Sequence, residues 1–230
     1  MVEALEWEEL LTLIQPLAGE RLLEVGSGSG RRLARLVNRG LDVLGVEADP
    51  TLAEEARRRL GRSHLVQPGS PEALPFEDNV FDLVLVGQAL NLARDPAAVL
   101  AEAGRVARRR VVVEVVNPLS CLGIRRRLNN RQPAYRHWFT TWGLKNLFAQ
   151  VFGQTPVVFS TLLTFPQSWL TWSKGLERSS FFRQSPFGGL IFMTVDIRYT
   201  LITDQLAAPV KLAPAGPVSG GVGAGSQSQG

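Results

Sequence analysis

The residues most able to do chemistry form a glycine turn between two acidic residues. Glu24 ends a short apolar run, and Gly26, Gly28 and Gly30 follow it at every second position. Glycine permits a sharp turn with positive φ and removes Cβ atoms that would hold a ligand away from the backbone. The free N–H groups at the start of a following helix would then face that ligand. Glu47 ends the next apolar run, and a carboxylate there can accept hydrogen bonds from two vicinal hydroxyls of a ribose.

The spacing of the glycines excludes two common phosphate-binding loops. A Walker A loop needs Gly-Lys-Ser/Thr after four intervening residues, and no lysine stands there. A dinucleotide fingerprint needs Gly-x-Gly-x-x-Gly, but its last position is Arg31 when it begins at Gly26 and Leu33 when it begins at Gly28. What remains is acid-x-Gly-x-Gly-x-Gly, with a second acid at the end of the next strand.

Alternating strands and helices must position this turn. The apolar pattern predicts strands at 21–25, 42–46, 64–67, 81–86 and 110–116, with helices near 5–16, 29–38, 50–60 and 96–107. This alternation indicates an α/β fold with a doubly wound parallel sheet, which binds ligands at the carboxyl ends of its strands. Two late strands, at 156–161 and 190–200, would extend the sheet to seven strands, after helices at 119–131 and 141–152.

Charge distribution, apolar run length and cysteine content indicate the compartment of the protein and limit the metals that it can bind. Through Glu114 the chain holds 14 Lys/Arg and 18 Asp/Glu, a net charge of −4, and from Val115 onward it holds 11 and 3, a net charge of +8. No stretch approaches ~18 uninterrupted apolar residues, so we expect no membrane span. The acidic start does not resemble a signal peptide, and the single Cys121 cannot form an internal disulfide, so we expect a cytoplasmic protein with Cys121 buried. One cysteine and two histidines give no zinc ligand set, so we expect no metal.

The glycine turn, read with the motifs that follow it, resembles a known enzyme family. Residues 24–30 are similar to motif I of class I S-adenosylmethionine-dependent methyltransferases, and residues 45–50 resemble the family's ribose-binding strand end. Residues 69–82 are similar to the adenine loop and fourth strand of the small-molecule branch that includes ubiquinone and menaquinone methyltransferases. Further matches, in order, are 95–107, 139–153 and 186–198. The resemblance implies a Rossmann-like, mostly parallel sheet with an antiparallel last strand.

The resemblance also implies which residues bind S-adenosyl-L-methionine. The family has an acid that accepts from the adenine amino group where this chain has Ser70, with Glu72 close by in sequence. Gly87 and Gln88 would approach the sulfonium. The cofactor-binding residues implied by the family are Glu24, Gly26, Ser27, Gly28, Gly30, Glu47, Ala48, Ser70, Pro71, Gly87 and Gln88.

The family's architecture also suggests where the acceptor binds. We expect a methyltransferase domain at 1–206, with lid or substrate segments at about 1–18, 119–142 and 165–187, and a disordered tail rich in Gly, Ala, Ser and Pro at 207–230. Aromatic residues in the lid suit a flat or apolar small acceptor. The candidate substrate residues are Tyr135, His137, Trp138, Trp169 and Trp172.

Methyl transfer by in-line displacement to a small aromatic or apolar acceptor is the leading prediction. No base is obvious after the fourth strand, and His137 is the one candidate. Two alternatives stay open: an RNA or protein methyltransferase that uses the basic second half, which is not favoured, and a non-catalytic S-adenosylmethionine-binding protein. Arg125 to Arg127 fit either a solvated basic surface or a site that faces an anionic acceptor, RNA or a lipid surface. The sequence does not indicate the oligomeric state.

Overall fold

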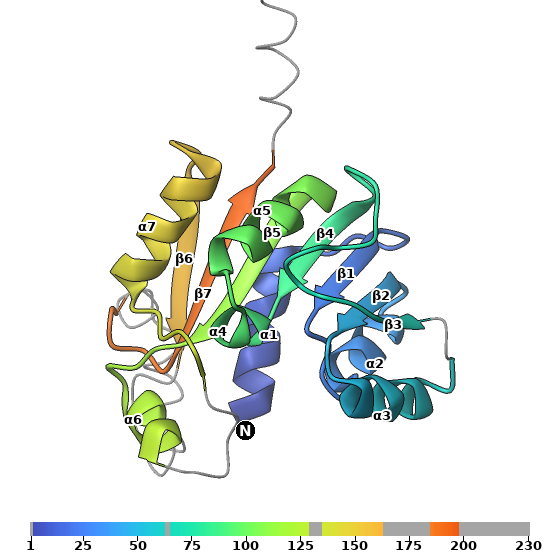
Figure 1. Ribbon diagram of the computed structural model, residues 1–230, viewed down its shortest axis with the longest axis horizontal. Helices are drawn as coiled ribbons and strands as arrows, with labels where there is room; N and C mark the ends of the chain where they lie inside the picture. Colours follow the sequence, from blue (N-terminus) through green and yellow to red (C-terminus); the bar gives the residue numbers. More distant parts are fainter. Residues whose placement is uncertain (1, 63–64, 129–134, 163–184, 198–230) are drawn as a thin grey trace, which may run out of the picture. The chain divides into compact units, whose positions relative to one another are not determined.

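A seven-stranded sheet forms the centre of the protein (Figure 1). The structure is a computed structural model that describes residues 2–62, 65–128, 135–162 and 185–197. The strand order is β3-β2-β1-β4-β5-β7-β6, and β7 runs antiparallel to both of its neighbours while the other pairs are parallel. The strands are β1 (Arg21–Val25), β2 (Asp42–Glu47), β3 (Val66–Pro68), β4 (Phe81–Val86), β5 (Ala107–Val116), β6 (Val157–Leu162) and β7 (Leu190–Asp196).

Helices cover both faces of the sheet because the strand side chains are apolar on both sides. Leu23 and Val25 of β1 belong to a core cluster with residues of α5 and α7, whereas Leu22 belongs to a second cluster with residues of α1, α2 and α3. The helices are α1 (Val2–Ile14), α2 (Arg31–Val37), α3 (Pro50–Leu60), α4 (Ala89–Leu92), α5 (Pro96–Val106), α6 (Cys121–Leu128) and α7 (Thr141–Phe152).

Two Asp-Pro pairs fix the starts of helices that follow strands. The Asp49 carboxylate accepts from the backbone N–H groups of Thr51 and Leu52 at the start of α3. Asp95 caps α5 in the same way. An N-cap side chain satisfies helix N–H groups that have no partner within the helix, and proline is preorganised for the first helical position. These caps therefore fix where the chain turns back onto the sheet.

The sheet confirms the fold class predicted from the sequence, including the antiparallel last strand. The boundaries of β1, β4, α3 and α7 agree with the predicted ranges, but the four-residue helix α4 was not predicted. The expectation that Cys121 is buried is wrong, because the residue is exposed on α6.

Several sequence predictions lie outside the described residues. These are the first residue of the strand predicted at 64–67, most of the lid segment predicted at 165–187, the candidates Trp169 and Trp172, and the tail at 207–230. Chain contacts divide the protein into a unit Met1–Arg198 and a unit Tyr199–Gly230, so the predicted boundary at 206 stays a prediction. Among the described residues, no helix is both long and apolar enough to cross a membrane.

Candidate active site

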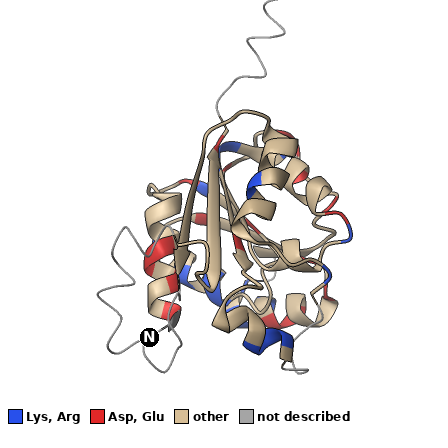
Figure 2. Ribbon diagram, turned by 90° about the vertical axis from the view of Figure 1, so that its left-hand side faces the viewer, with Lys and Arg blue, Asp and Glu red and all other residues tan. Residues whose placement is uncertain are grey.

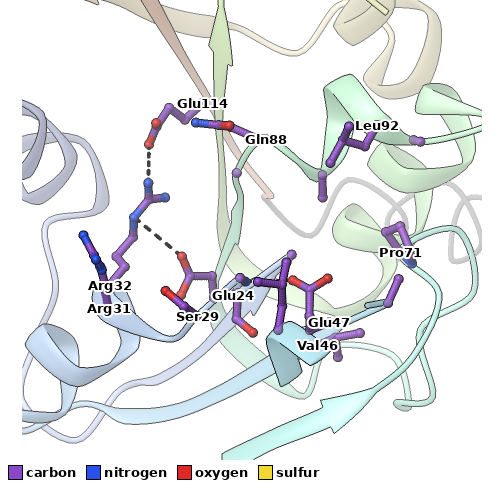
Figure 3. A pocket seen from close by; sticks show the side chains of 18 of the residues that line it. Glu24, Ser29, Arg31, Arg32, Val46, Glu47, Pro71, Gln88, Leu92 and Glu114 are labelled. Carbon is purple, nitrogen blue, oxygen red and sulfur yellow. Dashed lines mark hydrogen bonds and ion pairs between the residues drawn. The ribbon is translucent and has the colours of Figure 1, made fainter. Parts of the chain in front are cut away.

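A cavity of about 1150 Å³ lies at the carboxyl ends of β1, β2 and β4, where doubly wound sheets bind their ligands (Figure 3). Pockets that bind one drug-sized ligand typically measure roughly 300–1,000 Å³. The cavity therefore has room for a nucleoside-sized molecule and a second small molecule. Its lining includes the glycine turn, the end of β2, the loop after β3 and the start of α4, together with residues of α1 and β5.

The glycine turn packs closely on one side and is open on the other. Gly26 has a φ of +76°, and a Cβ on it would lie 2.5 Å from the Cβ of Ala89, so the turn touches the start of α4. Gly28 has a φ of +53°, and a Cβ on it would meet nothing within 4 Å. Gly28 lines the cavity, so the backbone at this point is open to a ligand.

Glu47 is held at the end of β2 by backbone N–H groups. Its Oε2 accepts from Gly28 N at 2.7 Å, and its Oε1 accepts from Asp49 N at 3.0 Å. The residue is buried yet lines the cavity. Each carboxylate oxygen can accept a second hydrogen bond. The Glu47 carboxylate therefore keeps the capacity to accept further hydrogen bonds from a ligand in the cavity.

Arg32 of α2 links two buried carboxylates at the other end of the cavity. Its Nη2 donates to Glu114 Oε2 at 2.8 Å, and its Nε lies 3.5 Å from Glu24 Oε1 (Figure 3). Burial raises the pKa of Glu24 to about 7, against the opposing effect of Arg32, and the neighbouring carboxylates Glu114 and Glu47 raise it further. When Glu24 is ionised, the two carboxylates around one guanidinium leave a negative charge in this part of the cavity.

Two atoms of this cluster lack hydrogen-bond partners among the described residues. Both Glu24 Oε2 and Arg32 Nη1 are fully buried, and both residues line the cavity. A buried polar atom without a partner costs about 1–3 kcal/mol, so its presence in a cavity points to a ligand that supplies the partner. An α-amino acid carries an ammonium and a carboxylate on one carbon, and it would satisfy the free oxygen and the free nitrogen together.

The opposite end of the cavity has the apolar surface that a nucleoside base requires. Ala48, Leu52, Pro71 and Leu92 line it. Ser70, which stands where the family has an acid, donates to Glu72 Oε2 at 2.6 Å. Ser70 therefore brings the Glu72 carboxylate to this part of the cavity lining.

A hydrogen-bonded chain leads from the middle of the cavity to α6. The Tyr135 hydroxyl donates to Gln88 Oε1 at 2.6 Å and accepts from Arg126 Nη1 at 2.9 Å.

Glu6, on α1, lines the cavity on the side of Glu114. Burial raises the pKa of Glu6 to about 6, and the neighbouring carboxylate Glu114 adds to the effect. Figure 2 shows how acidic residues gather on this N-terminal helix.

The predicted cofactor residues largely share this one cavity. All of them line it except Gly30, which begins α2. Of the predicted substrate residues, Tyr135 reaches the cavity residue Gln88, and Trp138 packs edge-on against Tyr135 with ring centroids 5.0 Å apart. The His137 ring stacks on Phe139 and is not part of the cavity lining.

Sequence reasoning did not single out several residues of the cavity lining. Among them are the charged residues Glu6, Arg32 and Glu114, which come from three separate elements. A signal for Glu114 was present, because it is an acid within the valine-rich run 111–116 of a buried strand, and buried carboxylates are rare unless paired. An acidic residue in an apolar run does not indicate that its partner is Arg32 on α2.

Comparisons with known proteins agree with the fold and the cavity. A family model described as a methyltransferase domain matches residues 23–113. An uncharacterized methyltransferase of Mycobacterium tuberculosis is 38% identical over 106 residues, which are 46% of this chain and 40% of that protein. A demethylmenaquinone methyltransferase of a Roseiflexus species is 31% identical over 169 residues, 71% of this chain and 66% of that protein. The chain thus spans about two fifths of the length of the mycobacterial relative.

Solved structures share the same architecture. An S-adenosylmethionine-dependent methyltransferase of Thermotoga maritima, described as a possible histamine N-methyltransferase, is 23% identical with a TM-score of 0.60, over 85% of this chain and 96% of that chain. The chain belongs to the class I S-adenosylmethionine-dependent methyltransferases. Among them it is similar to the small-molecule methyltransferases that include the demethylmenaquinone enzymes.

Proposed function

We propose that the protein transfers the methyl group of S-adenosylmethionine to a small acceptor molecule. The observation that carries the proposal is one cavity that holds both the vicinal-hydroxyl acceptor Glu47 and the unpartnered pair of Glu24 Oε2 and Arg32 Nη1. The cofactor supplies an activated sulfonium methyl group when bound.

Three residues would bind the two polar ends of the cofactor. Glu47 accepts hydrogen bonds from the ribose hydroxyls, while Glu24 accepts from the ammonium and Arg32 donates to the carboxylate of the methionine part. Contacts at both ends fix the position and orientation of the donor, and alignment alone can supply a large part of the rate enhancement of a displacement.

The acceptor would lie between α1, Gln88 and Glu114. Trp7 and Leu10 give this part of the cavity apolar surface, and Glu6 and Glu114 give it carboxylates. This combination supports a small, partly apolar or aromatic acceptor with a hydrogen-bond donor. The reduced, hydroxyl-bearing form of the quinone in the names of the demethylmenaquinone relatives would fit this description. We place this reaction in the cytoplasm, as expected from the sequence.

Glu6 is the candidate general base for an acceptor that keeps a proton on its nucleophilic atom. A base works best when its pKa lies near the working pH, and the pKa of Glu6 is raised to about 6. No ion pair within 4 Å holds Glu6 among the described residues. Glu6 would accept the acceptor's proton as the methyl group is transferred and then release it to water.

Calorimetry with S-adenosylmethionine and its demethylated product tests the donor part of the proposal. We expect the wild type to bind both, and we expect Glu47→Ala or Gly28→Val to weaken binding at least tenfold. Glu77→Gln is the matched control, because Glu77 is exposed and lies outside the cavity lining. No binding by the folded wild type would refute the proposal.

A transfer assay with labelled donor tests the acceptor part. A panel of quinols, phenols, amines and carboxylates would be presented to the wild type and to Glu6→Gln. We expect turnover with a hydroxyl-bearing aromatic compound and a large loss of kcat in Glu6→Gln at unchanged cofactor affinity. Tight cofactor binding with no turnover across the panel would favour a non-catalytic binding protein.

A further inference from the structure

The helix α6 has two distinct faces, and one of them is fixed to the domain. Gly123 is buried, and a Cβ on it would overlap the carbonyl oxygen of Asn117. The Ser120 hydroxyl donates to Asn117 O at 2.7 Å and accepts from Gly123 N at 2.9 Å. These contacts hold α6 beyond the carboxyl end of β5 (Figure 1).

The other face of α6 is apolar yet exposed. Ile124 and Leu128, one helical turn apart, are 51% and 79% exposed, and Leu119 before the helix is 52% exposed. The Asn117 side chain donates to the carbonyls of Pro186 and Gly188, which ties the turn carrying Phe187, 57% exposed, to the start of α6. We call Leu119, Ile124, Leu128 and Phe187 the apolar rim. Several large apolar side chains exposed around one helix indicate an interaction surface.

The helix α6 itself carries positive charge beside the apolar rim. Arg125 and Arg127 are exposed on α6 itself, and the helix contains no acidic residue. Along the sequence no Asp or Glu stands between Glu114 and Glu177. Apolar side chains flanked by arginines are the signature of a helix that lies in the surface of an anionic membrane. RNA would be recognised by cations with stacking aromatic residues, whereas three of the four residues of the apolar rim are aliphatic leucine or isoleucine.

The same helix contacts the active site through its inner face. Arg126 donates to the Tyr135 hydroxyl, which donates to Gln88 in the cavity lining. Two hydrogen bonds therefore separate the helix from the place where the acceptor would bind. A protein resting on a membrane through the apolar rim would have this part of its structure closest to the lipid.

We propose that the apolar rim and the arginines of α6 dock the protein on an anionic lipid bilayer surface, so that the cavity takes an acceptor dissolved in that bilayer. The statement about the acceptor rests on the proposed function, whereas the docking itself does not depend on it. We name a lipid surface because Ile124 and Leu128 of the apolar rim lie on the same helix as Arg125 and Arg127. Anionic lipid offers both an apolar interior for the rim and negative charge for the arginines.

Co-sedimentation with vesicles tests the docking. We expect the full chain to bind phosphatidylcholine vesicles containing phosphatidylglycerol, with binding that weakens at higher salt, and to bind pure phosphatidylcholine vesicles much less. The double variant Ile124→Gln and Leu128→Gln should bind at least tenfold more weakly. Replacing Arg125 and Arg127 by glutamine should weaken binding about fivefold for each arginine.

Leu17→Gln is the matched control, since Leu17 is 66% exposed in the turn before β1, at the amino end of the sheet strands. Equal loss of vesicle binding in this control would overturn the proposal, as would no binding by the wild type. A wild-type dimer that disappears in the Ile124→Gln, Leu128→Gln variant would assign the surface to a second copy and also overturn it. Calorimetry with S-adenosylmethionine on each variant checks the fold and tests the proposed function separately.

Discussion

The raised pKa of Glu24 predicts that cofactor binding releases a proton. Glu24 lies against Arg32, Glu114 and Glu47, and its pKa of about 7 means that half of the molecules carry a neutral Glu24 at pH 7. An ammonium group binds the ionised carboxylate. Binding should therefore weaken as the pH falls through 7, because the fraction of protein with an ionised Glu24 decreases.

The expected size of the effect follows from that fraction. With a pKa of about 7, Glu24 is about 50% ionised at pH 7 and roughly 3% ionised at pH 5.5. The apparent Kd is the intrinsic Kd divided by the competent fraction, so it should rise about fifteenfold between pH 7 and pH 5.5. The α-amino group of the ligand titrates near 7.7–8.0 and is protonated throughout this range.

Titration calorimetry in buffers of different ionisation enthalpy measures both the Kd and the proton released. We expect release of about half a proton at pH 7 from the wild type, and release of almost none from Glu24→Gln, which should bind more weakly and without this pH dependence. Glu6, whose pKa is about 6, lies in the same cavity, so Glu6→Gln separates its contribution. An unchanged wild-type Kd between pH 5.5 and pH 7, or the same pH dependence in Glu24→Gln, would refute the reasoning.

Three further changes test other parts of the structure. Glu24→Gln should raise the unfolding free energy of the cofactor-free protein at pH 8 by up to about 3 kcal/mol. A carboxyl group whose pKa is raised in the folded state favours folding at low pH, and this stability is lost as the pH rises from 4.5 to about 7. Denaturant titrations of both proteins at pH 5 and pH 8 measure the difference. Asn117→Ala removes one buried and one partly buried hydrogen bond to the turn before β7 and should lower the unfolding free energy by about 2–4 kcal/mol, measured by urea titration. Tyr135→Phe frees Gln88 from its hydroxyl partner and should change the acceptor KM severalfold while the calorimetric cofactor Kd stays the same.

The sequence predicted the parts of the fold that local chemistry determines. The Asp-Pro pairs at 49 and 95 carry their own capping side chains, so the starts of α3 and α5 agreed with the prediction. Continuous apolar runs flanked by turns defined β1 and β4. The helix α4 has only four residues, which is too short for a helical period to appear in the sequence.

The parts of the site that depend on distant contacts could not be predicted. Arg32 and Glu114 are 82 residues apart, and their hydrogen bond exists because β4 alone separates β1 from β5 in the sheet. His137 was a candidate base because of its residue type, but its ring stacks on Phe139. Residue type selects possible chemistry, whereas packing decides which side chains reach the cavity.

The bridge made by Arg32 also limits how this protein can be redesigned. Its guanidinium passes beside Gly87, where an added Cβ would lie 3.6 Å from Nη1, and it joins a helix that follows β1 to a carboxylate on β5. Loss of the guanidinium alone would leave two acids facing each other without compensation, and loss of Glu114 alone would leave a cation with half its partners. Attempts to retarget the donor pocket, by laboratory evolution or by design, should therefore change positions 32 and 114 together.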